Sequence, residues 1–322
     1  MCETHVRNGK HFSEIVLGGI MGMVVGDALG VPVEFVSRNR LKEEPVTDMR
    51  EYGSHEQPKG TWSDDSSMAL CLLDSLMNGV DYNDICSKFL AWVNEGYMTA
   101  HGQIFDIGRT TLAALRSYDK GIPPLECGRS SENDNGNGSL MRILPVAFYA
   151  MEMAEKERFE LAHNISKLTH GHMRSMMACG CCVQLAVELI KGGSKEEAHR
   201  HMIEVCEDYY SKEEELENFR RILDEKIGSL REEAVKSSGY VIDTLEAAIW
   251  CLLTTENYKE CVLKAVNLGE DTDTTAAVAG GLAGILYGYE GIPEGWKAAV
   301  AKREEIEGLC LRFGEGHTHR HN

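Results

Sequence analysis

Apolar residues recur every three or four positions along most of this sequence, and no other feature constrains the fold as strongly. The pattern runs through residues 70–77, 85–93, 112–115, 245–253 and 262–268. This spacing places apolar side chains on one face of an α-helix, whereas the period-two alternation that is typical of strands is scarce. We therefore predict a mostly α-helical fold.

Two of the most apolar segments carry glycines on a single helix face. Gly18, Gly22 and Gly26 are spaced four residues apart, and so are Gly280 and Gly284. Glycine has no side chain and lets the backbones of two helices approach closely. We interpret these glycines as packing positions in helices at the centre of a bundle.

The organisation of the chain is that of one domain. The 322 residues are 43% hydrophobic, which is enough apolar material for a large core. The sequences that begin at Ser194 and Ser211 are typical of capping boxes, and each predicts a helix start. No long Pro/Gly/Ser linker divides the chain, so we predict a single domain spanning residues 1–322, with its core at about 13–305 and a disordered tail at 314–322.

Charge and cysteine content narrow the functional classes. The formal net charge of −18 argues against an overall basic surface for a nucleic-acid backbone and leaves only a local basic groove open. The 11 cysteines are scattered and follow no secretory signal, so we expect a cytoplasmic protein with buried, inert thiols at Cys179 and Cys182. Asp27 interrupts the most apolar segment, which is shorter than the ~20 residues of a membrane span, so we expect no membrane partner.

Two polar segments with similar chemistry directly precede apolar helices, at residues 60–67 and 269–276. Taken singly, each is more often a helix cap, because Asp, Ser and Thr accept hydrogen bonds from the first amides of a helix. Taken together, four converging carboxylates would repel one another without cations. Oxygen-only ligands favour Mg²⁺ or Mn²⁺, and less often Ca²⁺, over zinc.

A third candidate site is the glycine-rich segment NGNGSLMR at residues 135–142. Amides in such a segment are suited to phosphate or sugar oxygens. Its spacing is neither that of a dinucleotide-binding loop nor that of a P-loop, and no β-α-β pattern surrounds it. Taken alone, it is equally typical of a simple turn.

Seven motifs in one order resemble the ADP-ribosylglycohydrolase family, which includes the dinitrogenase reductase-activating glycohydrolase and the ADP-ribosylhydrolases. The resemblance extends from about residue 15 to residue 289. The motifs are GDALGVPVE at 26–34, WSDDS at 62–66, FDIGRTT at 105–111, GNGSLMR at 136–142, TH at 169–170, GYVIDTL at 239–245 and GEDTDTTA at 269–276.

The resemblance implies a fold, a cofactor and a reaction. The fold would be all-α, a single compact orthogonal bundle of many helices with a central cleft that holds two Mg²⁺ or Mn²⁺ ions. The reaction would be hydrolysis of the bond between the anomeric carbon of ADP-ribose and an acceptor. The implied metal ligands are Ser63, Asp64, Asp65, Asp271, Asp273 and Thr274. The implied contacts to ribose, phosphate and nucleotide are Gly136, Asn137, Gly138, Ser139, Leu140, Met141, Arg142, His170 and Tyr240.

The resemblance also places two carboxylates, Glu34 and Asp106, in the catalytic site. Glycosidic cleavage passes through an oxocarbenium-like state, and a carboxylate can activate water or protonate the leaving group. We assign that role to Glu34 before Asp106. Without the motifs, we would interpret Glu34 as a surface residue and Asp106 as a helix N-cap. His170 would be a hydrogen-bonded histidine in the wall of a cleft, and Tyr240 a core residue.

The chain departs from the commonest family pattern at three positions. Serine stands at Ser63 and Ser66 where threonine is frequent, and Glu270 replaces a glycine. The hydroxyls are kept, whereas Glu270 adds a charge that affects metal affinity or the choice of acceptor. Two other functions stay open: a metal-dependent hydrolase of another nucleotide or phosphorylated substrate, and a non-catalytic ADP-ribose binder. The motifs specify neither the oligomeric state nor the acceptor, which is arginine, serine, a nucleic-acid base or an acyl group.

Overall fold

The computed structural model of the chain describes residues 11–320, and the side chains of residues 11–316. Within these residues, α-helices and short 3-10 helices form the regular structure, with only isolated β-bridges. The mostly α-helical prediction is therefore confirmed. The α-helices are α1 (Phe12–Gly30), α2 (Arg38–Glu43), α3 (Asp64–Leu76), α4 (Tyr82–Glu95), α5 (Arg109–Asp119), α6 (Leu144–Tyr149), α7 (Glu155–Lys167), α8 (Met173–Ile190), α9 (Lys195–Tyr209), α10 (Val241–Leu253), α11 (Tyr258–Val266), α12 (Thr272–Tyr287), α13 (Glu294–Ala299) and α14 (Arg303–Arg320). The 3-10 helices are η1 (Val31–Val33), η2 (Gly53–His55), η3 (Pro124–Glu126), η4 (Glu132–Asp134), η5 (Glu214–Phe219), η6 (Glu225–Ser229), η7 (Glu232–Ala234) and η8 (Tyr289–Gly291).

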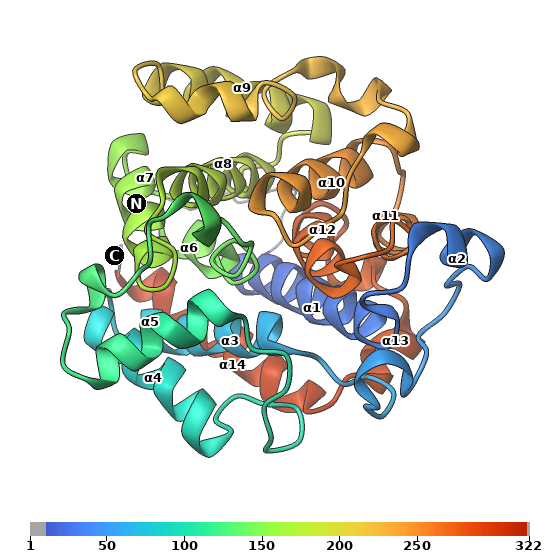
Figure 1. Cartoon of the computed structure of the whole chain (residues 1–322), viewed down its shortest axis with the longest axis horizontal. Coiled ribbons are helices and arrows are strands. Elements are labelled where there is room, and N and C mark those ends of the chain that lie inside the picture. The colour runs from blue at the N-terminus through green and yellow to red at the C-terminus, as the bar shows by residue number, and fades with distance from the viewer. Residues whose placement is uncertain (1–10, 321–322) are drawn as a thin grey trace.

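Helices α1 and α12 lie side by side at the centre of the molecule (Figure 1). The predicted glycines form their contact: a Cβ on Gly22 would stand 2.4 Å from the carbonyl oxygen of Gly280, and one on Gly18 would stand 2.7 Å from that of Gly284. Farther along α1, a Cβ on Gly26 would lie 2.1 Å from the carbonyl oxygen of Ala276. The two helices are therefore antiparallel, and the C-terminal end of α1 meets the N-terminal end of α12.

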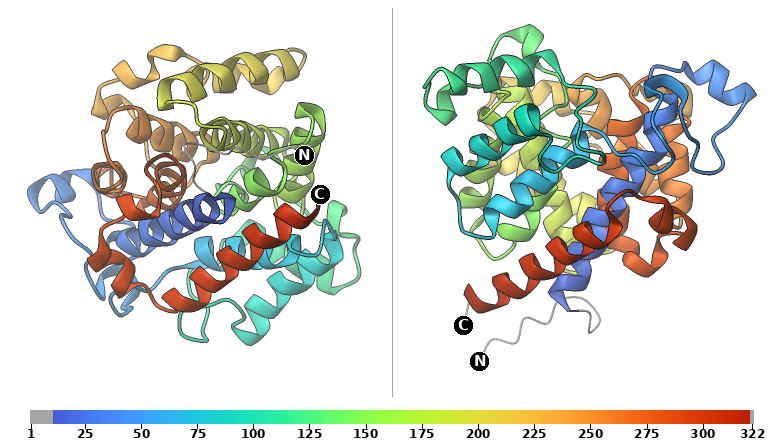
Figure 2. Two further views of the ribbon diagram at one scale, coloured as in Figure 1. Left: turned by 180° about the vertical axis from the view of Figure 1, so that it is seen from behind. Right: turned by 90° about the horizontal axis from the view of Figure 1, so that it is seen from below.

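The remaining helices cover this central pair. Helices α10 and α11 pack against α12, and α8 lies between α7 and α9. Helix α14 crosses α1 and also contacts α3, as Figure 2 shows from behind and from below. The helices form one bundle around the central pair, as the two views show.

The C-terminal region differs from the expected core boundary and disordered tail. Helix α14 continues to Arg320, and its side chains Ile306, Leu309, Cys310 and Phe313 are buried. The core extends past residue 305 because α14 covers α1 and α3 with these apolar residues. Only residues 321 and 322 of the expected tail lie outside the described backbone.

One of the two predicted capping boxes forms. The Ser194 side chain accepts a hydrogen bond from the amide of Glu197, and Glu197 bonds back to the Ser194 amide, so α9 begins there. The helix start predicted at Ser211 is wrong, because the chain there turns into the 3-10 helix η5 with Glu213 as its N-cap.

Burial accounts for two other features of the composition. Helix α1 with η1, and helix α8, are long and apolar enough to cross a membrane, but 94% of each apolar window is buried inside the fold. Both are core helices. The described cysteines form no disulfide, and burial raises the pKa of Cys179 to about 11 and that of Cys182 further still. The prediction of buried thiols at these two positions is confirmed.

Candidate active site

The carboxylate of Asp27 joins α1 to the start of α3. Asp27 is fully buried and accepts hydrogen bonds from the amides of Ser63 at 3.0 Å and Ser66 at 3.1 Å, and from the Ser66 hydroxyl at 2.5 Å. The Ser63 hydroxyl in turn caps α3 by accepting from the amide of Asp65 at 3.3 Å. Burial raises the pKa of Asp27 to about 6 in spite of these bonds. Asp27 therefore fixes the segment that carries Asp64 and Asp65.

The structure brings the two acidic segments together. The Thr274 hydroxyl, in the first turn of α12, donates to Asp65 Oδ1 at 3.3 Å. The glycine-rich segment joins them, since the Asn137 side-chain amide donates to Asp271 Oδ2 at 2.8 Å. The close contact of α1 with α12 produces this convergence, because it delivers Asp273 to the C-terminal end of α1.

The buried carboxylates in this cluster lack enough partners of their own. Asp65 Oδ2, Asp271 Oδ1 and Asp273 Oδ2 are buried without a hydrogen-bond partner. Burial, followed by repulsion between neighbouring carboxylates, raises the pKa of Asp64, Asp65 and Asp273 well above the ordinary value, and burial raises that of Asp271. Buried charges of one sign require a counter-charge.

A divalent cation fits this donor set. One ligand oxygen from each of Asp27, Asp65 and Asp273 lies within 4.8 Å of the others, and the same holds for Glu34, Asp271 and Asp273. All these donors are oxygens, which suits a hard ion such as Mg²⁺ or Mn²⁺. The partnerless oxygens point to the same conclusion, because an ion would satisfy them.

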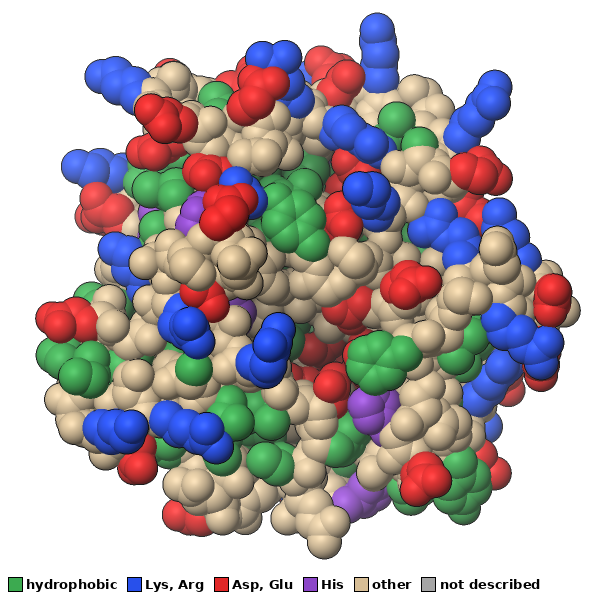
Figure 3. Space-filling view, viewed as in Figure 1, with side chains coloured by type: hydrophobic (Ala, Val, Ile, Leu, Met, Phe, Trp, Pro, Cys, Tyr) green, Lys and Arg blue, Asp and Glu red, His purple; other side chains and the backbone are tan. Residues whose placement is uncertain are grey.

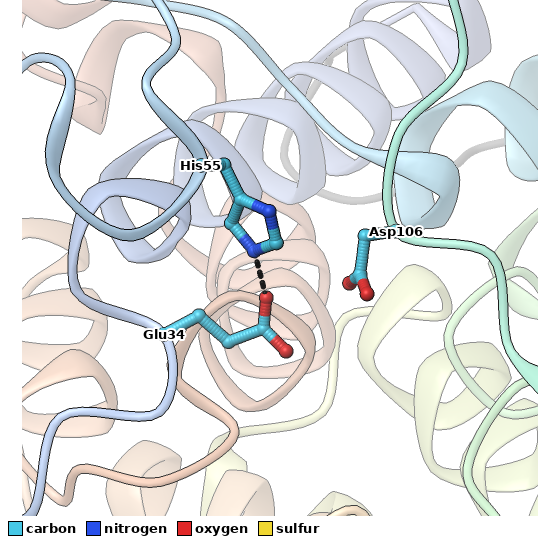
Figure 4. A group of neighbouring side chains, drawn as sticks. All are labelled: Glu34, His55 and Asp106. Atoms are coloured by element: carbon cyan, nitrogen blue, oxygen red, sulfur yellow. Dashed lines mark hydrogen bonds and ion pairs between the residues drawn. The ribbon is translucent and has the colours of Figure 1, made fainter.

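Glu34, His55 and Asp106 form a second group beside this cluster (Figure 4). Glu34 follows η1 and is 5% exposed, so it is not a surface residue. His55 Nε2, at the end of η2, donates a short hydrogen bond to Glu34 Oε2. Burial raises the pKa of Glu34 to about 7, the bond from His55 opposes this shift, and Asp106 and Asp271 add to it. The bond to Glu34 raises the pKa of His55.

Asp106 faces the Glu34–His55 pair from another segment of the chain (Figure 4). It is half-buried and has a left-handed backbone, with φ of 52°. Helix α5 begins at Arg109 with Gly108 as its N-cap, so Asp106 is not the cap of that helix. A strained, half-buried carboxylate beside a second carboxylate is typical of a functional site.

These groups lie in a hollow of the surface. In Figure 3, acidic side chains are visible at the bottom of a depression in the middle of the face, with a histidine and a hydrophobic side chain at its edge. The depression lies over the region where α1, α3 and α12 meet in Figure 1. The carboxylates are therefore within reach of a ligand.

The glycine-rich segment lies against a histidine. A Cβ on Gly138 would stand 2.8 Å from Cε1 of His170, so only glycine fits there. The Thr169 hydroxyl accepts from Arg142 at 2.8 Å and forms a hydrogen bond with His170 Nδ1 at 2.8 Å, and the other ring nitrogen, Nε2, faces Gly136 and Gly138. Burial, together with the Arg142 charge, lowers the pKa of His170 to about 3, so its ring is neutral.

Residues 139–142 of the glycine-rich segment are buried beneath residues 136–138. Ser139, Leu140, Met141 and Arg142 are buried, and the Arg142 guanidinium donates to the carbonyl oxygens of Gly138 and Ile165. The structure therefore brings the backbone of residues 136–138 to the cleft and points the Arg142 side chain into the protein.

Tyr240 lies next to the glycine-rich segment. It forms an isolated bridge with Gly136, and its half-buried ring lies 5.9 Å from the Arg174 guanidinium carbon. It is therefore not a core residue. Its ring packs partly against the core and stays partly exposed.

Sequence reasoning missed two residues of this site. Asp27 was given no role in the site, although a lone carboxylate in the apolar sequence MGMVVGDALG was an available signal. His55 ends the short 3-10 helix η2, whose caps Tyr52 and Glu56 both have a positive φ, and no motif marks it.

A sequence model of the family described as ADP-ribosylglycohydrolase matches residues 9–322. The chain belongs to this family, and it is an enzyme of the ADP-ribosyl glycohydrolase type.

Individual relatives agree with this assignment. An ADP-ribosylarginine hydrolase Tri1 of Serratia proteamaculans is 34% identical over 91% of this chain and 77% of its own length. An ADP-ribosyl-[dinitrogen reductase] glycohydrolase of Rhodospirillum rubrum is 30% identical over 93% and 94%. A solved structure titled ADP-ribosylglycohydrolase-related protein complex is 32% identical, with a TM-score of 0.79 over 95% of this chain and 98% of the other. The resemblance and the all-α fold predicted from the sequence are thus both confirmed.

Proposed function

We propose that the protein is a divalent-metal-dependent hydrolase that releases ADP-ribose from an acceptor. The observation that carries this proposal is the set of partnerless carboxylate oxygens on Asp65, Asp271 and Asp273, buried beside Glu34. A hydrolase that needed only a general acid and base would have no use for several buried carboxylates that repel one another.

Two Mg²⁺ or Mn²⁺ ions would be held by oxygens from two segments. The proposed ligands are Ser63, Asp64, Asp65, Asp271, Asp273 and Thr274. When bound, such ions orient ribose hydroxyls and lower the pKa of a nearby water. Asp27 holds the segment that carries Asp64 and Asp65 in place through its bonds to Ser63 and Ser66.

The chain's own acid–base group is Glu34. His55 occupies Oε2 of the Glu34 carboxylate, which leaves Oε1 to accept a proton from the attacking water. Water adds to the anomeric carbon as the bond to the acceptor breaks, and the proton passes to the leaving group. A pKa of about 7 suits Glu34 to both halves of this transfer near neutral pH. Asp106, facing the pair, is the second candidate for the proton donor.

The remaining contacts would hold the ADP-ribosyl group. The amides of Gly136 and Gly138 and the Nε2 atom of His170 would bind phosphate or ribose oxygens, whereas the Asn137 amide donates to the Gly239 carbonyl oxygen. The half-buried ring of Tyr240 would lie along the nucleotide. Both sets of contacts act in the ground state, separately from the carboxylate that moves the proton.

For the acceptor, we favour a guanidinium nitrogen. Two relatives at 34% identity, from Serratia proteamaculans and Pseudomonas putida, are named ADP-ribosylarginine hydrolases. A cleft with several carboxylates attracts a cationic group and would disfavour an acidic acceptor.

The ten described cysteines, none in a disulfide, support a reducing cytoplasmic location.

The experiment that tests the proposal is the Glu34→Gln substitution. Glutamine keeps the size of the side chain and removes the base, so turnover should fall by about two to four orders of magnitude while ADP-ribose binding survives. The assays are single-turnover release of ADP-ribose from ADP-ribosylated arginine with Mg²⁺, and ADP-ribose affinity by calorimetry, with Asp106→Asn measured alongside. Near-normal turnover in Glu34→Gln would transfer the role to Asp106, and release unaffected by excess chelator would refute metal dependence.

A further inference from the structure

Three aromatic rings form a continuous wall next to the two candidate catalytic carboxylates. The ring centroids of Phe35 and His55 lie 5.8 Å apart, and those of His55 and Phe105 lie 5.2 Å apart. Phe35 directly follows Glu34, and Phe105 directly precedes Asp106. We call Phe35, His55 and Phe105 the aromatic wall.

Phe35 is the exposed end of the aromatic wall. Its side chain is 69% exposed, although phenylalanine is normally buried, and its backbone is left-handed with φ of 66°. Its ring contacts His55, which is bonded to Glu34, so the exposed aromatic surface borders the reaction centre.

The strained backbone of Phe35 is held in place by a second strained residue. The Phe35 amide donates to the carbonyl oxygen of Glu270 at 2.7 Å, and the Glu270 amide donates to that of Val36 at 2.9 Å. Glu270 is also left-handed, with φ of 63°. Strain at two bonded residues persists only where the surroundings enforce it, and such sites are commonly functional.

We propose that Phe35 of the aromatic wall binds the planar, positively charged leaving group of the substrate, a guanidinium, on the acceptor side of Glu34. This inference rests on the proposed hydrolase function and adds the residue that selects the acceptor. A guanidinium stacks on an aromatic face through cation–π attraction and flat contact. The Phe35 ring is tilted by 53° relative to the His55 ring, and its 69% exposure leaves most of the ring open to a ligand.

The neighbouring carboxylates complete the recognition of a cation. Ligand atoms of Glu34, His55 and Asp106 lie within 4.8 Å of one another, and each carboxylate residue is adjacent in sequence to a ring of the wall. Phe35 offers no hydrogen-bonding group, so it distinguishes a planar cation from a small hydroxyl-linked acceptor, which gains little from a ring face. We therefore expect Phe35 to determine acceptor specificity and to leave ADP-ribose binding unaffected.

The test compares Phe35→Leu, which keeps an apolar side chain but removes the ring, with Phe35→Trp, which keeps a ring. With Mg²⁺ present, kcat/KM for ADP-ribosylarginine should fall roughly 3- to 30-fold in Phe35→Leu, mainly through KM, and stay within about threefold in Phe35→Trp. Release from ADP-ribosylserine should change by less than about threefold in both variants. Tyr52→Leu is the matched control, because Tyr52 is also an exposed aromatic residue with left-handed backbone.

A binding measurement separates this inference from the proposed function. Calorimetric titration of free L-arginine into protein saturated with Mg²⁺ and ADP-ribose needs no turnover, and Phe35→Leu should weaken it by a similar factor. Absence of turnover in the unmodified protein would count against the proposed hydrolase function alone. Equal losses for the arginine and serine substrates, or arginine binding that is the same in Phe35→Leu and the unmodified protein, would overturn the role of Phe35.

Discussion

Replacing Asp273 by asparagine should stabilise the metal-free protein and abolish its stabilisation by metal. Asp273 is 1% exposed, its Oδ1 accepts from the Thr274 amide at 2.9 Å, and its Oδ2 has no partner. Burial and then the carboxylates of Glu34, Asp65 and Asp271 raise its pKa well above the ordinary value. Asparagine has the shape of the protonated acid and carries no charge, so it relieves the repulsion.

The size of this effect follows from the cost of a buried charge without a counter-charge. Such a charge lowers the free energy of unfolding by roughly 3–5 kcal/mol. We expect Asp273→Asn to recover roughly 2–4 kcal/mol of this. With an unfolding entropy of about 2.1 cal/mol/K per residue, a chain of 322 residues gains about 1.5 °C in Tm per kcal/mol, or roughly 3–6 °C.

The assay is thermal unfolding with chelator and with Mg²⁺ or Mn²⁺. Metal at about 100 times its Kd should stabilise the unmodified protein by about 2.7 kcal/mol, or roughly 4 °C, and should leave Asp273→Asn nearly unchanged. Asp74→Asn is the control, because Asp74 accepts hydrogen bonds from Lys88 and Tyr97 at 2.7 Å, so its loss should lower the Tm and preserve the metal shift. A lower Tm for Asp273→Asn in chelator, or a full metal shift in that variant, would refute the reasoning.

Three further predictions concern metal choice, pH and helix packing. Mg²⁺ or Mn²⁺ should restore ADP-ribose release after chelation and Zn²⁺ should restore little, since the donors are all oxygens; strong activation by Zn²⁺ would contradict this. Folding raises the pKa of Asp27 to about 6 and that of Glu34 to about 7, so in chelator these two groups stabilise the folded protein near pH 4 and lose this contribution as the pH rises through 6 to 7. The Tm in chelator should therefore fall as the pH rises from 4 to 7, and Mg²⁺ should reduce the fall. Gly26→Ala should cost about 1–3 kcal/mol in urea unfolding and weaken metal binding, because its Cβ would lie 2.1 Å from the Ala276 carbonyl oxygen, whereas Gly295→Ala, with open space around it, should be nearly neutral.

The sequence predicts the parts of this fold that depend on spacing along one helix. Rows of glycine at intervals of four identified the contact faces of α1 and α12, and the structure confirms both. Spacing does not say which face meets which, so the pairing of Gly22 with Gly280 required the structure. The charged stretch after α9 forms 3-10 turns where a helix was predicted at Ser211, because its apolar residues are too few to bury one helix face.

In the site, too, local sequence identifies single segments, and contacts between segments that are distant in sequence require the structure. The two acidic segments were visible because carboxylates and hydroxyls cluster at helix starts, and their convergence through Thr274 and Asp65 needed coordinates. His55 could not be identified from the sequence, since a single histidine belongs to no periodic pattern and to no motif. Its bond to Glu34 depends on how η2 folds over η1. Asp106 could be named from its motif, whereas its left-handed backbone could not.

The pairing of α1 with α12 also sets the order in which the protein can fold during synthesis. The Thr272 hydroxyl bonds to the Gly30 carbonyl across 242 positions of the chain. At ribosomal rates of about 5–20 residues per second, the first helix waits roughly 12–50 s for its partner to be made. That helix and η1 have a mean hydropathy of 1.8 in their most apolar part, so the nascent chain exposes a strongly hydrophobic segment for most of translation. We expect chains that stop before residue 272 to aggregate or to stay bound to chaperones, and the cleft to form only once nearly the whole chain has left the ribosome.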